Sequence, residues 1–292
     1  MLYTTTVNIL RTSEWRRLFL CALLYSILTM TNAPGAHGQA AEEEDWNSYI
    51  AQYEESPGST TLNMALKEQA PLAAFPFCVV TGVVTKQCEE DGFPTQEEFE
   101  KLYQLGDDME VALKATGQFV HVGTFTSRCE RLSYFYVRDT ANVRSKLLEF
   151  YKEKYPQYGK PYIGIKSDAA WTYYLEFLYP NEETLDFMSN EAVVQKLEEA
   201  GDKVEKPRAV DHWLYFGNKK DRGNFIQYAT SQGYKVVSAE YVAEATPHYQ
   251  LHLSKEHKVD VGSVSEVTLT LRRKAIEYNG DYDGWSTAIV KE

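Results

Sequence analysis

Apolar positions along the chain recur at two spacings, one typical of strands and one typical of helices. The run 75–84 is continuously apolar and of strand length, which predicts a strand buried on both faces. Thr95 followed by Glu98 is a capping-box pattern, and apolar residues then recur at helical spacing as far as Gly117. This part of the chain therefore predicts a strand followed by a helix.

The segments on either side of this strand and helix predict the remaining elements of the first half of the chain. Residues 46–53 and 60–66 lie on either side of Ser56-Pro57-Gly58, which predicts a hairpin. The other elements expected before Pro180 are strands at 118–126 and 131–138, a helix at 142–155, and a last strand, TYYLEFLY, within 162–179.

The same order of elements recurs in the second half. A polar helical stretch at 182–204 separates the halves, and we interpret it as a connector. The elements expected after it are strands at 209–217, 234–243, 249–259 and 285–290, and helices at 219–232 and 263–278.

Both halves thus predict the order strand-helix-strand-strand-helix-strand, which is typical of ferredoxin-like domains. Right-handed crossovers place the strands in the order 4-1-3-2 with both helices on one face. We expect the sheet of the other repeat to cover the second face. The predicted fold is α+β, with two tandem ferredoxin-like repeats and an N-terminal hairpin. The predicted domains are 41–180, a connector at 181–205, and 206–292.

Residues 1–40 have the features of a secretory signal. A basic flank precedes the apolar run 18–30, which is shorter than a membrane-spanning helix, and small residues follow it. We expect cleavage near Gly38 or Ala40, which places the mature protein in the periplasm or outside the cell and leaves it free of the membrane. An uncleaved anchor and a buried helix are the open alternatives.

Composition narrows the range of partners. Hydrophobic residues make up 43% and charged residues 25% of the chain, which excludes a wholly disordered protein. The formal net charge is −12, and the basic residues are scattered, so a nucleic-acid partner is not expected. An acidic chain suits a basic protein surface.

The cysteines predict one disulfide. In the strand order 4-1-3-2, the end of the first strand lies beside the start of the third. Cys88 follows the first strand and Cys129 lies in the turn that opens the third, so the two can pair. Cys78, inside the first strand, is expected to be a buried free thiol. Two reduced surface thiols at Cys88 and Cys129 are the alternative.

Two groups of polar residues are candidates for chemistry. His248, His252 and His257 form a histidine cluster, but nothing fixes a further ligand, and exposed polar residues of a strand are the more common explanation. We therefore expect no metal and no cofactor.

Acidic residues precede a tryptophan in each half. Asp168 lies before Trp171, and Asp281 and Asp283 lie before Trp285. Paired carboxylates can act as general acid and base, whereas Asp at a turn commonly caps backbone N–H groups. Because no nucleophile or phosphate-loop motif accompanies them, we expect no catalysis, and we expect Asp283-Gly284 to form a turn in which the glycine has positive φ.

Aromatic residues offer a candidate binding surface. Trp171, Tyr173, Leu175, Phe177 and Tyr179 alternate along the last strand expected within 162–179. They therefore share one face there and either pack in the core or line a groove. The candidate binding residues are Trp171, Tyr173, Trp213, Tyr215, Tyr282, Asp283, Gly284 and Trp285.

Two sets of motifs carry a family resemblance. The first comprises His212, Trp213, Tyr215, Phe216, Gly233-Tyr234 and the tail 279–287 with its core Tyr282-Asp-Gly-Trp285. Because of these motifs, residues 208–292 resemble the regulator of ribonuclease E activity B family. The second comprises Trp46, Asn63, Ala70-Pro71, Gly92-Phe-Pro94, Leu105-Gly-Asp-Asp-Met109, Asp168-Ala-Ala-Trp171 and Leu178-Tyr-Pro180. Because of this second set, residues 46–180 look like the domain of unknown function 695 family.

The resemblance implies binding rather than catalysis, because the regulator family binds and restrains ribonuclease E. We expect an exported, non-catalytic protein that binds or regulates an unidentified protein partner. One alternative is a cytoplasmic ribonuclease E regulator, if 1–40 is not a signal. The other is a hydrolase that uses Asp168 with Asp281 and Asp283, with the histidine cluster as a further candidate.

Overall fold

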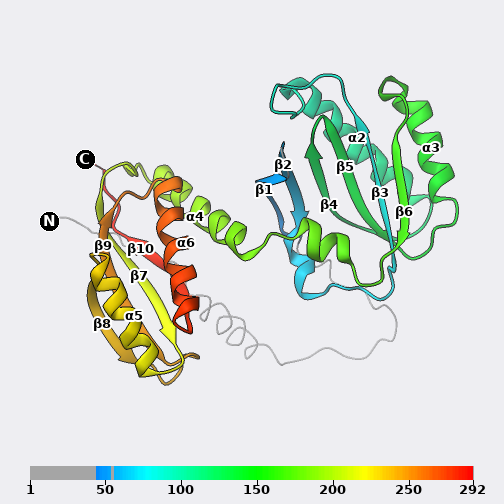
Figure 1. The fold of residues 1–292 in the computed structure, drawn as a ribbon. Coiled ribbons are helices and arrows are strands. Elements are labelled where there is room, and N and C mark those ends of the chain that lie inside the picture. The colour runs from blue at the N-terminus through cyan, green and yellow to red at the C-terminus, as the bar shows by residue number, and fades with distance from the viewer. Residues whose placement is uncertain (1–43, 54–55, 292) are drawn as a thin grey trace, which may run out of the picture. The chain divides into compact units, whose positions relative to one another are not determined.

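The protein is described by a computed structural model covering residues 44–53 and 56–291. These residues form two compact units, one ending at Thr184 and the other beginning at Leu185. Each unit is α+β and contains one antiparallel sheet with helices packed on it (Figure 1). The predicted secretory signal at 1–40 lies outside the described residues. Within the described ranges, no helix combines the length and apolar character needed to cross a membrane.

The N-terminal unit contains a six-stranded sheet in the order β1-β2-β4-β5-β3-β6. The predicted hairpin is present as β1 and β2, and β2 pairs with β4 to extend the sheet. Its strands are β1 (Trp46–Tyr53), β2 (Ser56–Asn63), β3 (Phe77–Val84), β4 (Phe119–Ser127), β5 (Glu130–Val137) and β6 (Tyr162–Ser167). Its helices are α2 (Gln96–Lys114) and α3 (Val143–Lys154), with short helical turns η1 (Met64–Glu68), η2 (Pro156–Tyr158) and η3 (Tyr173–Leu178).

Helices α2 and α3 cover one face of this sheet (Figure 1). Val79 of β3 and Phe135 of β5 pack there against Met109 of α2 and Leu147 of α3, and all four side chains are fully buried. The predicted helix start is confirmed, because the side chain of Thr95 accepts a hydrogen bond from the Glu98 backbone N–H.

The prediction of a last strand at TYYLEFLY is wrong. The edge strand that pairs with β3 is β6, which comes earlier in the chain than the predicted segment. The predicted segment forms η3. Here the Tyr179 N–H donates to the Tyr174 carbonyl in a π-helical pattern. The chain turns before η3 because Trp171 has a φ of +57° and Asp168 accepts hydrogen bonds from the following backbone. The alternating aromatic residues therefore do not share one strand face.

The segment around η3 packs on the second face of the same sheet. Trp171 is fully buried and stacks on Tyr136 of β5, with ring centroids 4.1 Å apart. Phe177 contacts Tyr134 of β5 and Phe125 of β4. This face, which we expected the other repeat to cover, thus receives its cover here from the N-terminal unit's own chain.

The cysteines lie as the strand order suggested. Strand β3 pairs with β5 so that Val84 lies opposite Glu130. Cys88 and Cys129 form a disulfide with their Cα atoms 5.8 Å apart. Cys78 is a buried free thiol in β3, and burial raises the pKa of this thiol to about 12.

The C-terminal unit contains a four-stranded sheet in the order β10-β7-β9-β8, which is the expected order 4-1-3-2. Helices α5 and α6 lie on the same side of it (Figure 1). Its strands are β7 (Arg208–Phe216), β8 (Lys235–Tyr241), β9 (Tyr249–His257) and β10 (Gly280–Thr287), and its helices are α5 (Lys219–Ser231) and α6 (Val261–Glu277).

The segment predicted as a connector forms helix α4 (Glu182–Glu199). It packs into the C-terminal unit, because Val194 and Leu197 are buried in one cluster with Val210 of β7 and Val264 of α6.

The last strand begins earlier than the sequence predicted, at Gly280 instead of residue 285. Asp283-Gly284 is not a turn, because it lies inside β10 at a bulge between Tyr282 and Gly284. Gly284 does have the expected positive φ, at +145°. Glycine with positive φ is favoured at a bulge as well as at a turn, so the sequence pattern did not distinguish the two.

Candidate functional site

The C-terminal sheet presents two chemically different faces. Along a strand, successive side chains point to opposite faces. On β7, Val210, Leu214 and Phe216 point into the cores under the helices. Asp211, Trp213 and Tyr215, which alternate with these inward residues, point the other way, to a face on which none of the described helices lies (Figure 1). We call this second face the helix-free face.

Strand register identifies the residues on the helix-free face. Trp213 of β7 lies opposite His252 of β9 and Gly284 of β10, and His252 lies opposite Ser238 of β8. Among the charged residues of this face, carboxylates predominate. The helix-free face comprises Asp211, Trp213, Tyr215, Lys235, Ser238, Glu240, Gln250, His252, Ser254, Glu256, Asp281, Gly284 and Ser286.

Trp213, His252 and Asp211 are in direct contact on this face. The rings of Trp213 and His252 stack with centroids 4.6 Å apart and planes inclined by 16°. The His252 Nε2 lies 3.1 Å from Asp211 Oδ1, but the two atoms do not meet the angles of a hydrogen bond. Among the described residues, no donor hydrogen-bonds the Asp211 carboxylate, which can therefore accept from a ligand.

Gly284 leaves a space beside Trp213. It lies opposite Trp213 on β10, and a Cβ atom built at this position would have no heavy atom within 4 Å. Nearby, the Gln250 side-chain amide donates to the Tyr215 hydroxyl. An aromatic surface bordered by carboxylates attracts cationic groups and repels phosphate. The chemistry of the helix-free face therefore suits a basic protein segment.

The candidate binding residues divide between the two faces. Trp213, Tyr215 and Gly284 lie on the helix-free face. Tyr282 and Trp285 are both buried under the helices, although they are an odd number of residues apart. The bulge adds one residue between them, so both point inward.

Tyr282 is part of a buried hydrogen-bond chain with two histidines. His257 Nδ1 lies 2.6 Å from the Lys258 carbonyl oxygen, so this nitrogen carries the proton and donates. In the neutral ring, Nε2 of His257 then accepts from Nε2 of His212 over 3.1 Å. His212 Nδ1 is left to accept from the Tyr282 hydroxyl over 2.9 Å.

This chain requires both imidazoles to be neutral. Burial lowers the pKa of His212 well below its ordinary value, and the neighbouring His257 lowers it further. Burial also lowers the pKa of His257 and raises that of Tyr282 well above its ordinary value. The three groups therefore contribute a fixed hydrogen-bond network to the core.

Trp285 connects the last strand to α4. Its Nε1 donates to Asn190 Oδ1 over 2.8 Å, and the Asn190 amide donates to the Thr268 hydroxyl on α6. The Thr268 hydroxyl donates to Asp186, which also pairs with Arg272 over 2.9 Å. All of these polar groups have partners, so the cluster holds the helices to the sheet.

In the N-terminal unit, Asp168 acts as a cap. Its carboxylate accepts from the backbone N–H groups of Thr172 and Tyr173 and from the Tyr136 hydroxyl. Burial acts to raise the pKa of Asp168, but these hydrogen bonds together lower it below its ordinary value. Tyr173, another candidate binding residue, accepts from Lys166 Nζ over 3.1 Å. Asp168 belongs to a different unit from Asp281 and Asp283.

The histidine cluster is dispersed over the C-terminal unit. His252 lies on the helix-free face, His257 points inward, and His248 lies before β9 with its Nδ1 3.3 Å from the Val242 carbonyl. Over the described part of the chain, no three histidine, cysteine or acidic residues are grouped so that they could hold a metal ion.

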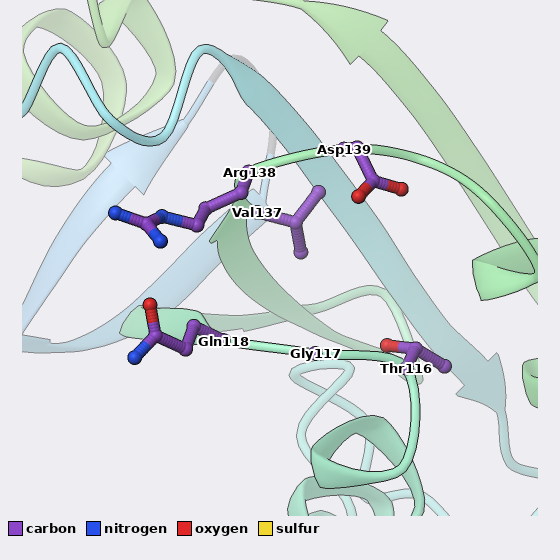
Figure 2. A pocket seen from close by; sticks show the side chains of 6 residues that line it. All are labelled: Thr116, Gly117, Gln118, Val137, Arg138 and Asp139. Carbon is purple, nitrogen blue, oxygen red and sulfur yellow. The ribbon is translucent and has the colours of Figure 1, made fainter.

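A small polar pocket of about 280 Å³ lies at one end of the N-terminal sheet (Figure 2). Asp139 in its wall accepts from the Ala141 backbone N–H. Arg138 and Asp139 point away from each other (Figure 2), so they do not form a paired site. The lining residues are Thr116, Gly117, Gln118, Val137, Arg138 and Asp139.

Comparison with known proteins identifies two family regions. Residues 44–179 match the Family of unknown function (DUF695), and residues 188–287 match the family Regulator of ribonuclease activity B. The chain thus joins a DUF695 region to a region of the regulator family, as the sequence motifs indicated. The helix-free face belongs to the regulator region.

No curated protein matches the chain. One similar solved structure is the crystal structure of an unknown protein from Galdieria sulphuraria, which is 11% identical in sequence. The match covers 73% of this chain and 98% of that chain with a TM-score of 0.20, which is too low to inform the fold.

Proposed function

We propose that this chain is a non-catalytic regulatory protein that binds a protein partner through the helix-free face. The observation that carries the proposal is the grouping of Trp213 with carboxylates on one face of the unit that matches the regulator family. Aromatic residues are enriched at the centres of protein interfaces, and complementary charge guides association. The partner surface is therefore basic.

The proposed absence of catalysis rests on what the candidate residues do. Asp168 is engaged in capping, and Tyr282 and Trp285 hold the core together. We also propose that both units are ferredoxin-like, which the two strand orders support. In the C-terminal unit, the sheet face without helices is then available for binding.

We further propose that the protein acts after export to the periplasm or cell exterior. The disulfide between Cys88 and Cys129 supports this location, since disulfides persist in oxidising compartments. A ribonuclease is the second candidate partner, and the match of residues 188–287 favours it. That partner would place the protein in the cytoplasm.

Two matched triple variants test the proposal. The face variant combines Asp211→Asn, Glu240→Gln and Asp281→Asn. The control combines three exposed residues of the helical layer, as Glu191→Gln, Glu198→Gln and Glu266→Gln. Both variants change the net charge by the same amount, so only the position of the charges differs.

The experiment is affinity isolation of partners from extracts of the native host. We expect one protein to be retained by the wild type and by the helical-layer control and to be lost with the face variant. Equal retention by all three chains, or no specific protein, would contradict binding through the helix-free face.

A further inference from the structure

We propose that the space beside Trp213 and above Gly284 is a slot for the guanidinium group of an arginine in the partner. This inference rests on the proposed binding function and names the group that the helix-free face recognises. His252 of β9 stacks on one ring face of Trp213. Because β7 lies between β9 and β10, the other ring face is directed toward β10.

The β10 residue paired with Trp213 has no side chain, and Asp283 before it is the extra residue of the bulge. Gly284 is paired with Trp213, and a Cβ added to it would meet nothing within 4 Å. Its φ of +145° also disfavours every other residue at this position. The backbone thus leaves one side-chain position next to the indole open.

Carboxylates border this open position. Asp211 precedes Trp213 by two residues on the same face of β7, and no described donor hydrogen-bonds it. Asp281 is the neighbouring residue of the same face on β10, and it is exposed. A group that fills the slot can therefore contact an aromatic ring and at least one carboxylate together.

Arginine satisfies both contacts better than lysine. Its planar guanidinium stacks on an indole while its N–H groups form paired hydrogen bonds to a carboxylate, whereas an ammonium group has no flat surface. The slot is also accessible, because β10 is the edge strand of the sheet. A partner segment can therefore reach it from the side without entering a deep groove.

The test is an NMR titration of the full chain with three nine-residue peptides of glycine, serine and threonine. The central residue is arginine, lysine or the neutral isostere citrulline. The probe is the Trp213 indole N–H resonance, identified by its absence from the spectrum of Trp213→Phe. We expect the arginine peptide to shift this resonance with saturation. Binding of the lysine peptide should be about fivefold weaker, and that of the citrulline peptide at least about tenfold weaker.

Variants at exposed side chains separate the slot from general charge attraction. Asp211→Asn and Asp281→Asn should each weaken arginine binding at least about threefold, and the helical-layer control should bind as the wild type does. Equal shifts with arginine and citrulline would overturn the slot, as would arginine-dependent shifts confined to other residues. If partner isolation succeeds but the Trp213 resonance does not respond, the slot is wrong and the binding function stands. If the resonance responds but no partner is retained, the site binds a guanidinium group, and the proposed binding of a partner protein is wrong.

Discussion

Trp285 and Asn190, 95 residues apart in the chain, are joined by a buried hydrogen bond of 2.8 Å from the indole Nε1 to the amide oxygen. This bond fixes α4 to β10 inside the C-terminal unit. The tryptophan of the motif Tyr282-Asp-Gly-Trp285 therefore contributes to the core, and the glycine next to it in the chain shapes the opposite face of the sheet.

Trp285→Phe should destabilise the C-terminal unit by about 1–3 kcal/mol. The substitution keeps most of the apolar volume but leaves the buried Asn190 oxygen without its donor. Urea unfolding followed by circular dichroism measures the change. Trp46→Phe is the control, because its Nε1 bonds exposed Glu44, and it should change the midpoint little. Equal midpoints for Trp285→Phe and the wild type would contradict the structural role.

Asp202→Asn should be more damaging, at about 3–5 kcal/mol. Arg208 Nη1 contacts both carboxylate oxygens of Asp202, and both side chains are buried. Removing the negative charge leaves the guanidinium buried without a counter-charge. Glu205→Gln disrupts an exposed pair with Lys258 and serves as the control, with little expected effect. If both variants unfold at the same urea concentration, the ion pair does not stabilise the unit as described.

Local patterns predicted most elements, but one aromatic alternation was misleading. The capping box at Thr95 placed α2 correctly because the signal lies within one turn of the chain. TYYLEFLY alternates as a strand does, yet it forms η3. Strand β6 pairs with β3 at the position that we expected for this segment. Asp168 then stabilises a turn after β6. Which of two segments pairs with a strand depends on tertiary contacts that the local pattern does not contain.

Stability should decrease as the pH falls below about 6.5. The folded pKa values of His212 and His257 are lowered by burial, so the unfolded chain binds more protons near and below the ordinary value of about 6.5. The stabilising contribution is complete above that pH and is lost as the pH falls toward the folded pKa values. Urea midpoints between pH 5 and 8 measure it.

His257→Asn is the matched variant for this pH dependence. It removes the outer histidine of the hydrogen-bond chain, so the slope of stability against pH between 5 and 6.5 should become smaller. A wild-type midpoint that is constant across this range would contradict the neutral chain of Tyr282, His212 and His257.

The cysteines give a prediction that is independent of binding. Peptide mass spectrometry without reduction should recover Cys88 linked to Cys129. Cys78 should resist iodoacetamide at pH 8 in the folded protein and react after unfolding, because burial raises its pKa to about 12. Rapid labelling of Cys78 in the folded protein, or a disulfide that includes it, would contradict the arrangement of β3.

The candidate site was only partly visible in the sequence. Trp213 and Tyr215 stood out as aromatic residues of a family motif, whereas Asp211 was missed, although it alternates with them on the same strand. The alternation Asp-x-Trp-x-Tyr was the available signal. The inward position of both Tyr282 and Trp285 depends on a bulge, and a bulge cannot be located from a period of two.

Photo-crosslinking in the native host shows directly whether a partner protein binds at the helix-free face. Benzoyl-phenylalanine is placed at Ser254 on the helix-free face or, as the control, at exposed Gln227 on α5. We expect one specific covalent adduct with a protein from Ser254 and no such adduct from Gln227. The Ser254 adduct should be lost when Asp211→Asn, Glu240→Gln and Asp281→Asn are combined. The same adducts from both positions, or none from Ser254, would contradict binding through the helix-free face.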